Sequence, residues 1–271
     1  MQGIEILGYV LALLVGASLG LIGSGGSILA VPILVYIFSI DPVIATAYSL
    51  FIVGSTSLVG GIENIYQKRV DFKTSLIFGI PSIATLYLAR LGILPNIPEV
   101  LFTVDGFEFT KSIFLMVLFA VVMIAASISM IRPCVDCGKY DLLEAPQINF
   151  NYPMIFLLGI GVGIMTGLVG AGGGFLIIPT LVIFAKMPMK LAVGTSLFII
   201  AFNSLLGFAG YVSSGVPIDW TFLFLFTGLA VVGIWLGILL SKRIKGSKLK
   251  IAFGWFVLAM GSYILAKELF F

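Results

Sequence analysis

The chain has 271 residues, of which 60% are hydrophobic and only 10% are charged, with a mean hydropathy of +1.20 and a formal net charge of +3. Soluble domains carry about 25% charged residues, so this composition excludes a water-soluble globular domain and indicates a polytopic membrane protein. Membrane topology accounts for the basic residues, and no basic face is left over for nucleic acid.

Ten apolar segments follow one another along the chain. They are apolar throughout, without the alternation of barrel strands, and a bilayer-spanning helix needs about 20 such residues. Glu5 stands where a secretory signal would have Lys or Arg, so we expect the first segment to be retained. The sequence therefore predicts an all-α polytopic membrane protein with helical segments at 4–22, 27–39, 43–62, 73–92, 110–131, 153–169, 174–186, 190–212, 220–241 and 250–270.

The positive charges orient these segments. With the loop 242–250 placed in the cytoplasm, twelve of the fifteen Lys and Arg residues lie on the inside, and only Arg90, Lys111 and Lys267 lie outside. Both termini and the loop 95–109 are then outside the cell membrane. Charge counting does not determine how deep the first-to-second and sixth-to-seventh turns lie, because a full crossing and a re-entrant hairpin give the same parity.

The chain also repeats itself. The segment Gly20–Val35 aligns with Gly167–Val182 at an offset of 147, and 9 of 16 positions are identical. The identities include four glycines and the pair Pro32 and Pro179. Chance similarity between apolar segments explains aliphatic matches, but it does not readily align glycines and a proline at fixed spacing.

Further matches extend the repeat. Ser49–Ile52 aligns with Ser196–Ile199 at the same offset, and Asp71-Phe72 aligns one residue further on with Asp219-Trp220. Each half holds five segments, an odd number, so the second half enters the membrane from the opposite side. Such inverted repeats are common in secondary transporters, although an old duplication without a transport role is the alternative. The expected division is an N-terminal membrane repeat at 1–131, a cytoplasmic linker at 132–152 and a C-terminal membrane repeat at 153–271.

A glycine turn interrupts the apolar run in each half. Glycine permits positive φ and close backbone approach, and the next segment then begins with unpaired N–H groups that attract anions. Since the two turns enter from opposite faces, we expect them to meet and form a small anion site. The alternative is helix packing through small residues. The turn residues of this predicted site are Gly23, Ser24, Gly25, Gly26, Gly170, Gly172, Gly173 and Gly174.

Polar residues in the third and eighth segments extend the predicted site. Ser49 and Ser196 are repeat-related and form the preferred pair, and Asn203 adds an amide. The further hydroxyls in the same segments are Thr46, Ser55, Thr56 and Ser57 in the third and Thr195 and Ser204 in the eighth. The alternative for each hydroxyl is a hydrogen bond to its own helix backbone.

At these residues the chain resembles the TauE/SafE family of membrane transporters and presumed sulfite exporters. The resemblance rests on the duplicated Gly-x-Gly-Gly followed by proline, on the Ala-x-x-x-Ser-Leu segments, and on the short loops that end in Asp-aromatic. It implies movement of sulfur-containing or related organic anions, such as sulfite and sulfonates, across the cell membrane. The first copy departs from the pattern, with Ser27 where the second has Gly174.

Two other groups of residues carry chemistry. Glu63, near the inner end of the third segment, is a candidate to carry a coupling proton. Its alternative is an interfacial carboxylate paired with Lys68 or Arg69. Cys134-Val-Asp-Cys137 has the spacing of a metal or redox pair, but the chain has no histidine to complete a zinc site. We therefore expect two incidental thiols, no metal and no cofactor.

The sequence thus predicts a secondary transporter that moves a small anion across the bilayer of the cell membrane by alternating access. An anion channel and a non-transporting membrane assembly subunit are the alternatives. An enzyme is not expected, because intramembrane serine proteases and histidine-ligated metalloproteases need a histidine. Coupling to a proton or another ion is left open, and so is a homodimer.

Overall fold

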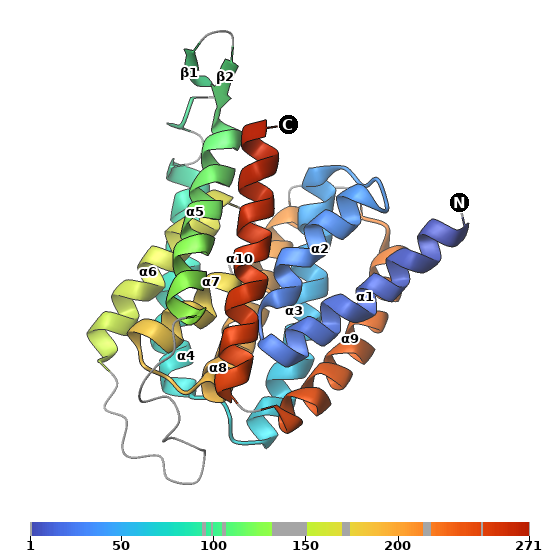
Figure 1. Cartoon of the computed structure of the whole chain (residues 1–271), viewed down its shortest axis with the longest axis vertical. Coiled ribbons are helices and arrows are strands. Elements are labelled where there is room, and N and C mark those ends of the chain that lie inside the picture. Colours follow the sequence, from blue (N-terminus) through green and yellow to red (C-terminus); the bar gives the residue numbers. More distant parts are fainter. Residues whose placement is uncertain are drawn as a thin grey trace.

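A computed structural model describes residues 2–93, 96–98, 100–104, 107–131, 151–169, 174–213, 218–244 and 246–270. The described residues form ten α-helices, which confirms the predicted all-α fold class (Figure 1). Each helix begins within four residues of the start of a predicted segment, although α7 ends seven residues before the predicted end at 186. The helices are α1 Gln2–Ile22, α2 Gly25–Tyr36, α3 Pro42–Tyr66, α4 Phe72–Leu88, α5 Lys111–Ile131, α6 Tyr152–Val169, α7 Gly174–Pro179, α8 Met189–Ser213, α9 Trp220–Arg243 and α10 Gly246–Phe270.

Two of these helices continue into a wider, π-helical turn. The turn Ala89–Ile93 follows α4, and the turn Thr180–Phe184 follows α7 directly after Pro179. Proline has no N–H to donate and crowds the preceding turn of a helix. Pro179 therefore accounts for the change from α-helical to π-helical geometry at the end of α7.

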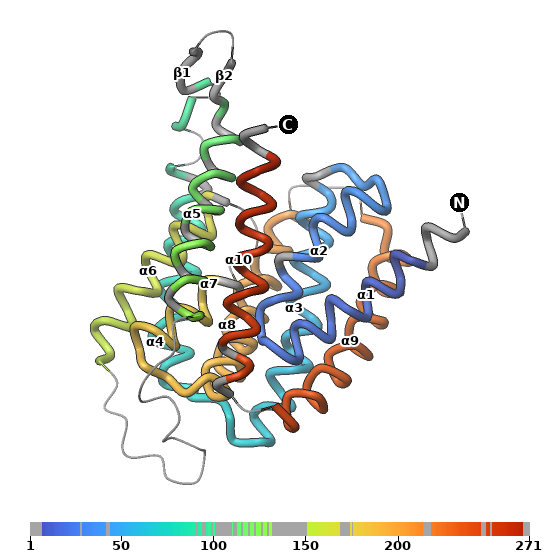
Figure 2. Tube along the Cα trace, viewed as in Figure 1, coloured from blue at the N-terminus to red at the C-terminus, as the bar shows by residue number. Residues whose placement is uncertain are grey.

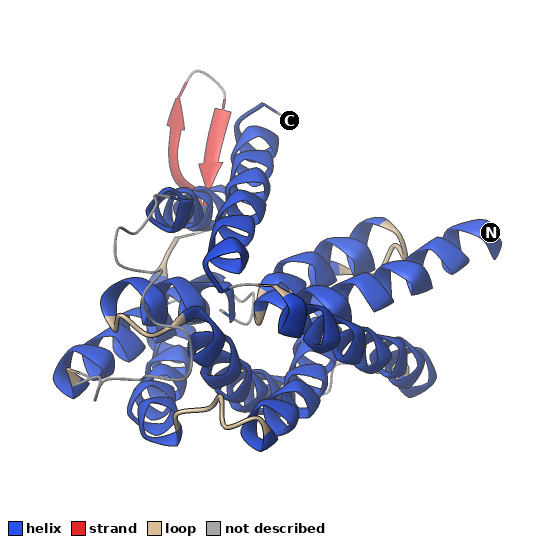
Figure 3. Cartoon of the chain, turned by 60° about the horizontal axis from the view of Figure 1, so that its bottom comes forward, coloured by secondary structure: helices blue, strands red, loops and turns tan. Residues whose placement is uncertain are grey.

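A β-hairpin replaces part of the loop predicted at 95–109. Strand β1, Val100–Val104, pairs antiparallel with β2, Phe107–Thr110. The register places Val104 opposite Phe107 and Val100 opposite Thr110, with an irregularity between Val100 and Phe102. The hairpin projects beyond the helices at the end where α10 finishes (Figure 3).

The helices differ in length, and α2 is among the short ones. Among the described residues, three helices are long and apolar enough to cross a membrane: Ile44–Tyr66, Met189–Ser213 and Trp220–Arg243. The 12 residues of α2 rise about 18 Å, less than the roughly 30 Å of the hydrocarbon core. The far end of α2 lies beside the last turn of α10, because Lys267 Nζ is 3.8 Å from the centroid of the Tyr36 ring.

Helices from the two halves of the chain interleave. Helix α1 lies along α9, and α5 lies along α10 (Figures 1 and 2). The other two close pairs are α4 with α6 and α3 with α8. Thus the first helix of each half packs on the fourth helix of the other half, while the third and fifth helices pair with their own counterparts.

Small residues permit this close packing. A Cβ added to Gly16 of α1 would overlap the backbone of Ala230 in α9, and a Cβ added to Gly163 of α6 would overlap the backbone of Ser82 in α4. Gly16 and Gly163 are related by the offset of 147, and Ser82 and Ala230 by the offset of 148 that follows Asp71. The two interfaces therefore use corresponding residues. Since lipid is as apolar as the side chains, close backbone contact is a main source of helix association in membranes.

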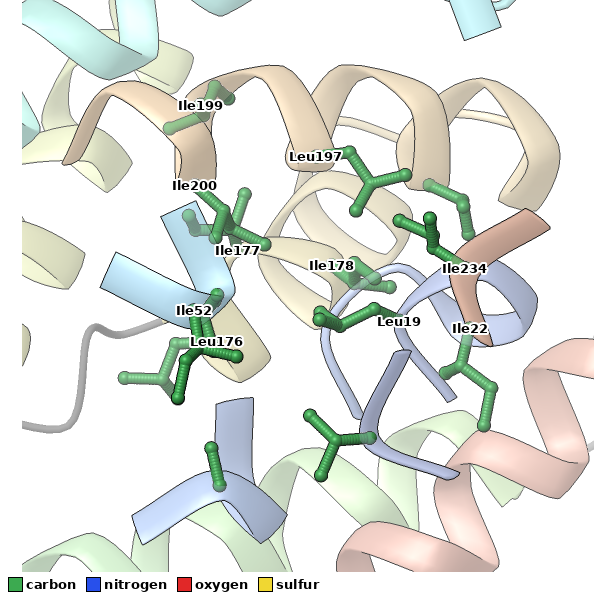
Figure 4. Packing of buried hydrophobic residues seen from close by; sticks show 14 of the residues in the cluster. Leu19, Ile22, Ile52, Leu176, Ile177, Ile178, Leu197, Ile199, Ile200 and Ile234 are labelled. Carbon is green, nitrogen blue, oxygen red and sulfur yellow. The ribbon is translucent and has the colours of Figure 1, made fainter. Parts of the chain in front are cut away.

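The apolar core lies where the first and second halves meet. Figure 4 shows Leu19 of α1, Ile178 of α7, Leu197 of α8 and Ile234 of α9 gathered together. Ile22, the last residue of α1, also belongs to this cluster. The core thus surrounds the turn that leads from α1 into α2, and it holds that turn inside the protein.

Candidate functional site

The first glycine turn reverses the chain within two residues. Gly23 has φ of +90°, a conformation that L side chains rarely adopt, and its N–H donates to the Leu19 carbonyl at 2.7 Å. Ser24 follows at the N-cap, and α2 begins at Gly25. The Ser27 N–H donates to the Ser24 carbonyl at 3.2 Å, while the amides of Gly25 and Gly26 have no carbonyl one turn earlier in the helix and remain available to other acceptors.

Two serines occupy this turn with different roles. The Ser27 hydroxyl donates to the Ser24 carbonyl at 2.7 Å, which ties the first turn of α2 to its cap. Ser24 is fully buried, and among the described residues its Oγ has no hydrogen-bond partner. A buried hydroxyl without a partner is costly, so this atom is a candidate to bind a polar ligand.

The starts of α2 and α7 meet. Gly174, the first residue of α7, is buried, and a Cβ added to it would lie 3.3 Å from Ser27 Oγ. Ser27 and Gly174 are repeat-related, and at this pair the first copy has serine where the second has glycine. The other residues of the second predicted turn, Gly170, Gly172 and Gly173, lie outside the described residues.

The structure places one of the two predicted serines at the turn. A Cβ added to Gly23 would lie 3.2 Å from the hydroxyl oxygen of Ser196, so α8 contacts the turn at this residue. The Ser196 hydroxyl itself donates to the Val193 carbonyl at 2.9 Å, which is the backbone alternative named above. Ser49, the repeat-related partner of Ser196, is buried in α3. By the repeat it would lie at the second glycine turn, at Gly170, which is outside the described residues.

Asn203 takes part in a buried contact between α8 and α4. Its Nδ2 donates to Ser82 Oγ at 3.2 Å, while its Oδ1 has no partner among the described residues. Ser82 was not predicted, because one serine in an apolar segment carries no signal of its own. Three further buried hydroxyls without a described partner belong to α3 and α8: Thr56, Ser57 and Ser204.

These unpartnered groups are related by the repeat. Thr56 and Asn203 are separated by 147 residues, and so are Ser57 and Ser204. Gly54 contacts Leu205 and Gly61 contacts Phe198, so α3 and α8 run antiparallel and cross between these two contacts. Both polar pairs therefore lie near the middle of the α3–α8 crossing.

Glu63 lies near the end of α3 and forms an ion pair. Its Oε1 is 3.6 Å from Lys242 Nζ and accepts a hydrogen bond from Gln67 Nε2 at 2.6 Å. The carboxylate thus contacts a cation of α9 rather than Lys68 or Arg69. Its role as a coupling group stays a prediction.

In the described part of the chain, no group of three or more His, Cys, Asp or Glu residues lies together in a way that could hold a metal ion. Cys134 and Cys137 lie outside the described residues.

Comparison with known proteins gives the class of the molecule. A protein of Xylella fastidiosa (strain 9a5c) named "Probable membrane transporter protein" is 30% identical over 259 residues, which cover 93% of this chain and 91% of that protein. The "Probable membrane transporter protein YunE" of Bacillus subtilis is 29% identical, with 84% of each chain covered. No solved structure matches the chain. The fold and these relatives together define a membrane-embedded transporter, not an enzyme.

The family match is specific. The family described as "Sulfite exporter TauE/SafE" matches residues 9–264, nearly the whole chain. The chain belongs to this family, which confirms the resemblance drawn from the glycine repeats.

Proposed function

We propose that this transporter carries a small sulfur-containing or related organic anion, of the sulfite and sulfonate class, and binds it between the starts of α2 and α7. The observation that carries the proposal is the contact between Ser27 and Gly174, which brings the two helix starts together inside the core. Ser196 lies beside Gly23 at the same place, so α8 contributes to the surroundings of the turn.

The chemistry of the turn suits an oxygen-rich anion. Sulfite and sulfonates present three oxygen acceptors, and an anion within the bilayer must be hydrogen-bonded or paired. The first amides of α2 and the buried Ser24 hydroxyl supply donors without a buried Lys or Arg. The predicted ligands Ser49, Asn203 and the second glycine turn extend this set in the proposal.

The transport mechanism we propose is alternating access of two inverted repeats around this site. The corresponding packing of α1 on α9 and of α6 on α4 supports it, because both interfaces use residues related by the sequence repeat. The depth of the first turn also supports it. With Tyr36 beside the end of α10, Gly23 lies about 18 Å further in, near the middle of a bilayer of ordinary thickness.

We further propose the cell membrane as the location, with both termini and the hairpin outside. The basic residues support this orientation. Lys242 joins Glu63 at the end where α3 and α9 finish, and Lys73 lies 4.1 Å from the Tyr152 ring at the end where α6 begins. These residues gather at the end of the bundle opposite to Lys267, as a cytoplasmic face requires.

The binding step is tested with purified protein. Sulfite or a small alkylsulfonate should raise the melting temperature in a saturable way, while chloride at the same ionic strength should not, because a specific ligand stabilises the folded state. In liposomes the flux of the same anion should saturate. Unsaturable flux would favour the channel, and no flux together with no stabilisation would favour an assembly subunit.

A variant pair locates the site. Gly25→Val should abolish the stabilisation by sulfite, because a β-branched side chain blocks approach to the first amides of α2. The position can accept a side chain, since an added Cβ meets its nearest neighbours at 3.5 Å. Gly228→Val in α9 is the control, because a Cβ there has no neighbour within 4 Å. Wild-type affinity in a folded Gly25→Val protein would place the site elsewhere.

A further inference from the structure

Two hydrogen bonds at opposite ends of the bundle correspond under the sequence repeat. The Asp71 N–H donates to Thr195 Oγ1 at 3.1 Å, and the Asp219 N–H donates to the Tyr48 hydroxyl at 2.6 Å. Tyr48 and Thr195 are separated by the offset of 147, and Asp71 and Asp219 by the offset of 148. The bonds therefore join corresponding residues of the two halves.

A ring contact accompanies each bond. Phe72 lies edge-to-face on Phe198, with ring centroids 5.5 Å apart and an interplanar angle of 84°. Trp220 lies edge-to-face on Phe51 at 6.4 Å and 88°. Phe51 and Phe198 are again separated by 147, and Phe72 and Trp220 by 148. Four residues at each end thus form one unit with one geometry.

We name these units after the elements they join. The α4–α8 clasp consists of Asp71, Phe72, Thr195 and Phe198, and the α3–α9 clasp consists of Tyr48, Phe51, Asp219 and Trp220. In each clasp the aspartate also caps its helix: Asp71 Oδ1 accepts from Lys73 N at 3.0 Å, and Asp219 Oδ1 accepts from Phe222 N at 3.1 Å.

The two clasps lie far apart along the transport axis. Tyr48 is near the start of α3, and Asp71 follows the end of α3 at Tyr66. The 18 residues between Tyr48 and Tyr66 rise about 27 Å, close to the thickness of the hydrocarbon core. One clasp therefore lies toward each face of the bundle, and the contacts of both are formed in this structure.

Each clasp lies next to a proposed ligand of the anion. Tyr48 precedes Ser49 in α3, and Thr195 precedes Ser196 in α8. Breaking one bond weakens the hold of α3 on the start of α9 or of α8 on the start of α4, and the two clasps share no residue. A hydroxyl in each clasp can thus hold one entrance of the anion site closed.

We propose that Tyr48 and Thr195 are the two gate residues of the transport cycle, so that opening the α3–α9 clasp exposes the site to the hairpin side and opening the α4–α8 clasp exposes it to the other side. This rests on the proposed alternating access. The structure with both clasps closed is then the occluded state between the two open ones.

The clasps make a directional prediction. Tyr48→Phe and Thr195→Val each remove one hydroxyl and keep the shape of the side chain. Each should shift the population toward the state open on its own side, by roughly twofold to tenfold for one hydrogen bond. If the two hydroxyls had a merely structural role, both variants would lose stability, but the populations would not shift in opposite directions.

Paired reporters measure the shift. Ile52 and Ile199 are buried, repeat-related and one turn beyond Tyr48 and Thr195. In a full-length background with Cys134→Ser and Cys137→Ser, we would measure the labelling rate of Ile52→Cys or Ile199→Cys by an impermeant thiol reagent added from one side of sealed vesicles. Tyr48→Phe should speed labelling of Cys at 52 from the hairpin side and slow that at 199 from the other side. Thr195→Val should do the reverse.

Controls make the result decisive. Thr195→Ser keeps the acceptor and should restore wild-type rates, and Thr166→Val should leave them unchanged, since the Thr166 hydroxyl donates within its own helix to the Val162 carbonyl at 2.7 Å. Shifts in the same direction at both reporters, or no shift, would overturn the clasp proposal. The labelling is done without anion, so failure of sulfite to bind would count against the proposed function and not against the clasps.

Discussion

Adjacent glycines at the start of α2 have different environments. A Cβ on Gly26 would overlap the Val15 carbonyl and lie 2.6 Å from the Leu19 side chain, whereas a Cβ on Gly25 meets only ordinary van der Waals contacts. Glycine is therefore needed for packing at position 26, and at position 25 it is left available for another purpose, such as approach of a ligand to the backbone.

The first prediction separates these two residues. Gly26→Ala should lower the melting temperature of the purified protein strongly, because a carbon forced against backbone costs about 1–3 kcal/mol. Gly25→Ala should leave it within a few degrees of wild type. Thermal unfolding monitored by intrinsic fluorescence measures both, and equal destabilisation by the two changes would contradict this assignment.

The second prediction concerns the amide of Asn203. Its Oδ1 is buried without a described partner, but Asn203→Leu also removes the hydrogen bond that Nδ2 donates to the buried Ser82 hydroxyl, so the variant should lose about 1–3 kcal/mol of stability and still fold. The same change should weaken sulfite binding by at least about fivefold, as expected for one lost hydrogen bond. If the variant unfolds more easily and binds normally, Asn203 is a structural residue that serves its contact with Ser82.

At this scale the sequence predicts residue types better than their contacts. The repeat singled out Ser196 and the turn at Gly23, and the structure brings them together. It did not predict Ser82, whose partner Asn203 lies 121 positions away. A hydrogen bond between distant helices leaves no periodic signal in either of them.

Among the elements, the α4–α6 interface depends on glycine. A Cβ on Gly163 of α6 would overlap the Thr85 hydroxyl and the Ser82 carbonyl, while a Cβ on Gly161 of the same helix has no neighbour within 4 Å. The third prediction is that Gly163→Leu prevents folding or lowers the melting temperature by more than ten degrees. Gly161→Leu should be tolerated, because it faces away from α4. Size-exclusion profiles and melting curves of the two variants test this prediction. If both substitutions are tolerated, α4 and α6 are not packed as described.

The hairpin shows what a search for apolar spans overlooks. Strands β1 and β2 flank Asp105-Gly106, and Asp-Gly between short apolar runs is a strong hairpin signal. The segment was predicted as a plain loop because it is too short and too polar to span a bilayer.

The sequence also did not predict which helices pack against one another. Every segment is apolar on all sides, so none shows which neighbour it contacts.

For the whole molecule, the fourth prediction is the orientation. An impermeant thiol reagent added to intact cells should label Asn96→Cys, which is exposed on the hairpin side, and should miss Cys134. The reason is the concentration of basic residues at the opposite end. Labelling of Cys134 alone would reverse the orientation and would assign the hairpin to the cytoplasm.

The fifth prediction concerns the linker between the halves. Cys134→Ser combined with Cys137→Ser should leave anion transport in liposomes unchanged, because two thiols in a chain without histidine make a poor metal site. Stoichiometric metal in the purified wild-type protein, or loss of transport in the double variant, would assign the pair a function.

The crossed packing of the halves has a consequence for biosynthesis. Gly16 of α1 contacts Ala230 of α9, so the partner of the first helix is made 214 residues later. At about 5–20 residues per second, a ribosome needs roughly 10–40 s to reach it. Throughout that time α1 presents a glycine-lined face to lipid or to the insertion machinery. The α1–α9 interface therefore forms late in biosynthesis, after helices α2 to α8 have been made.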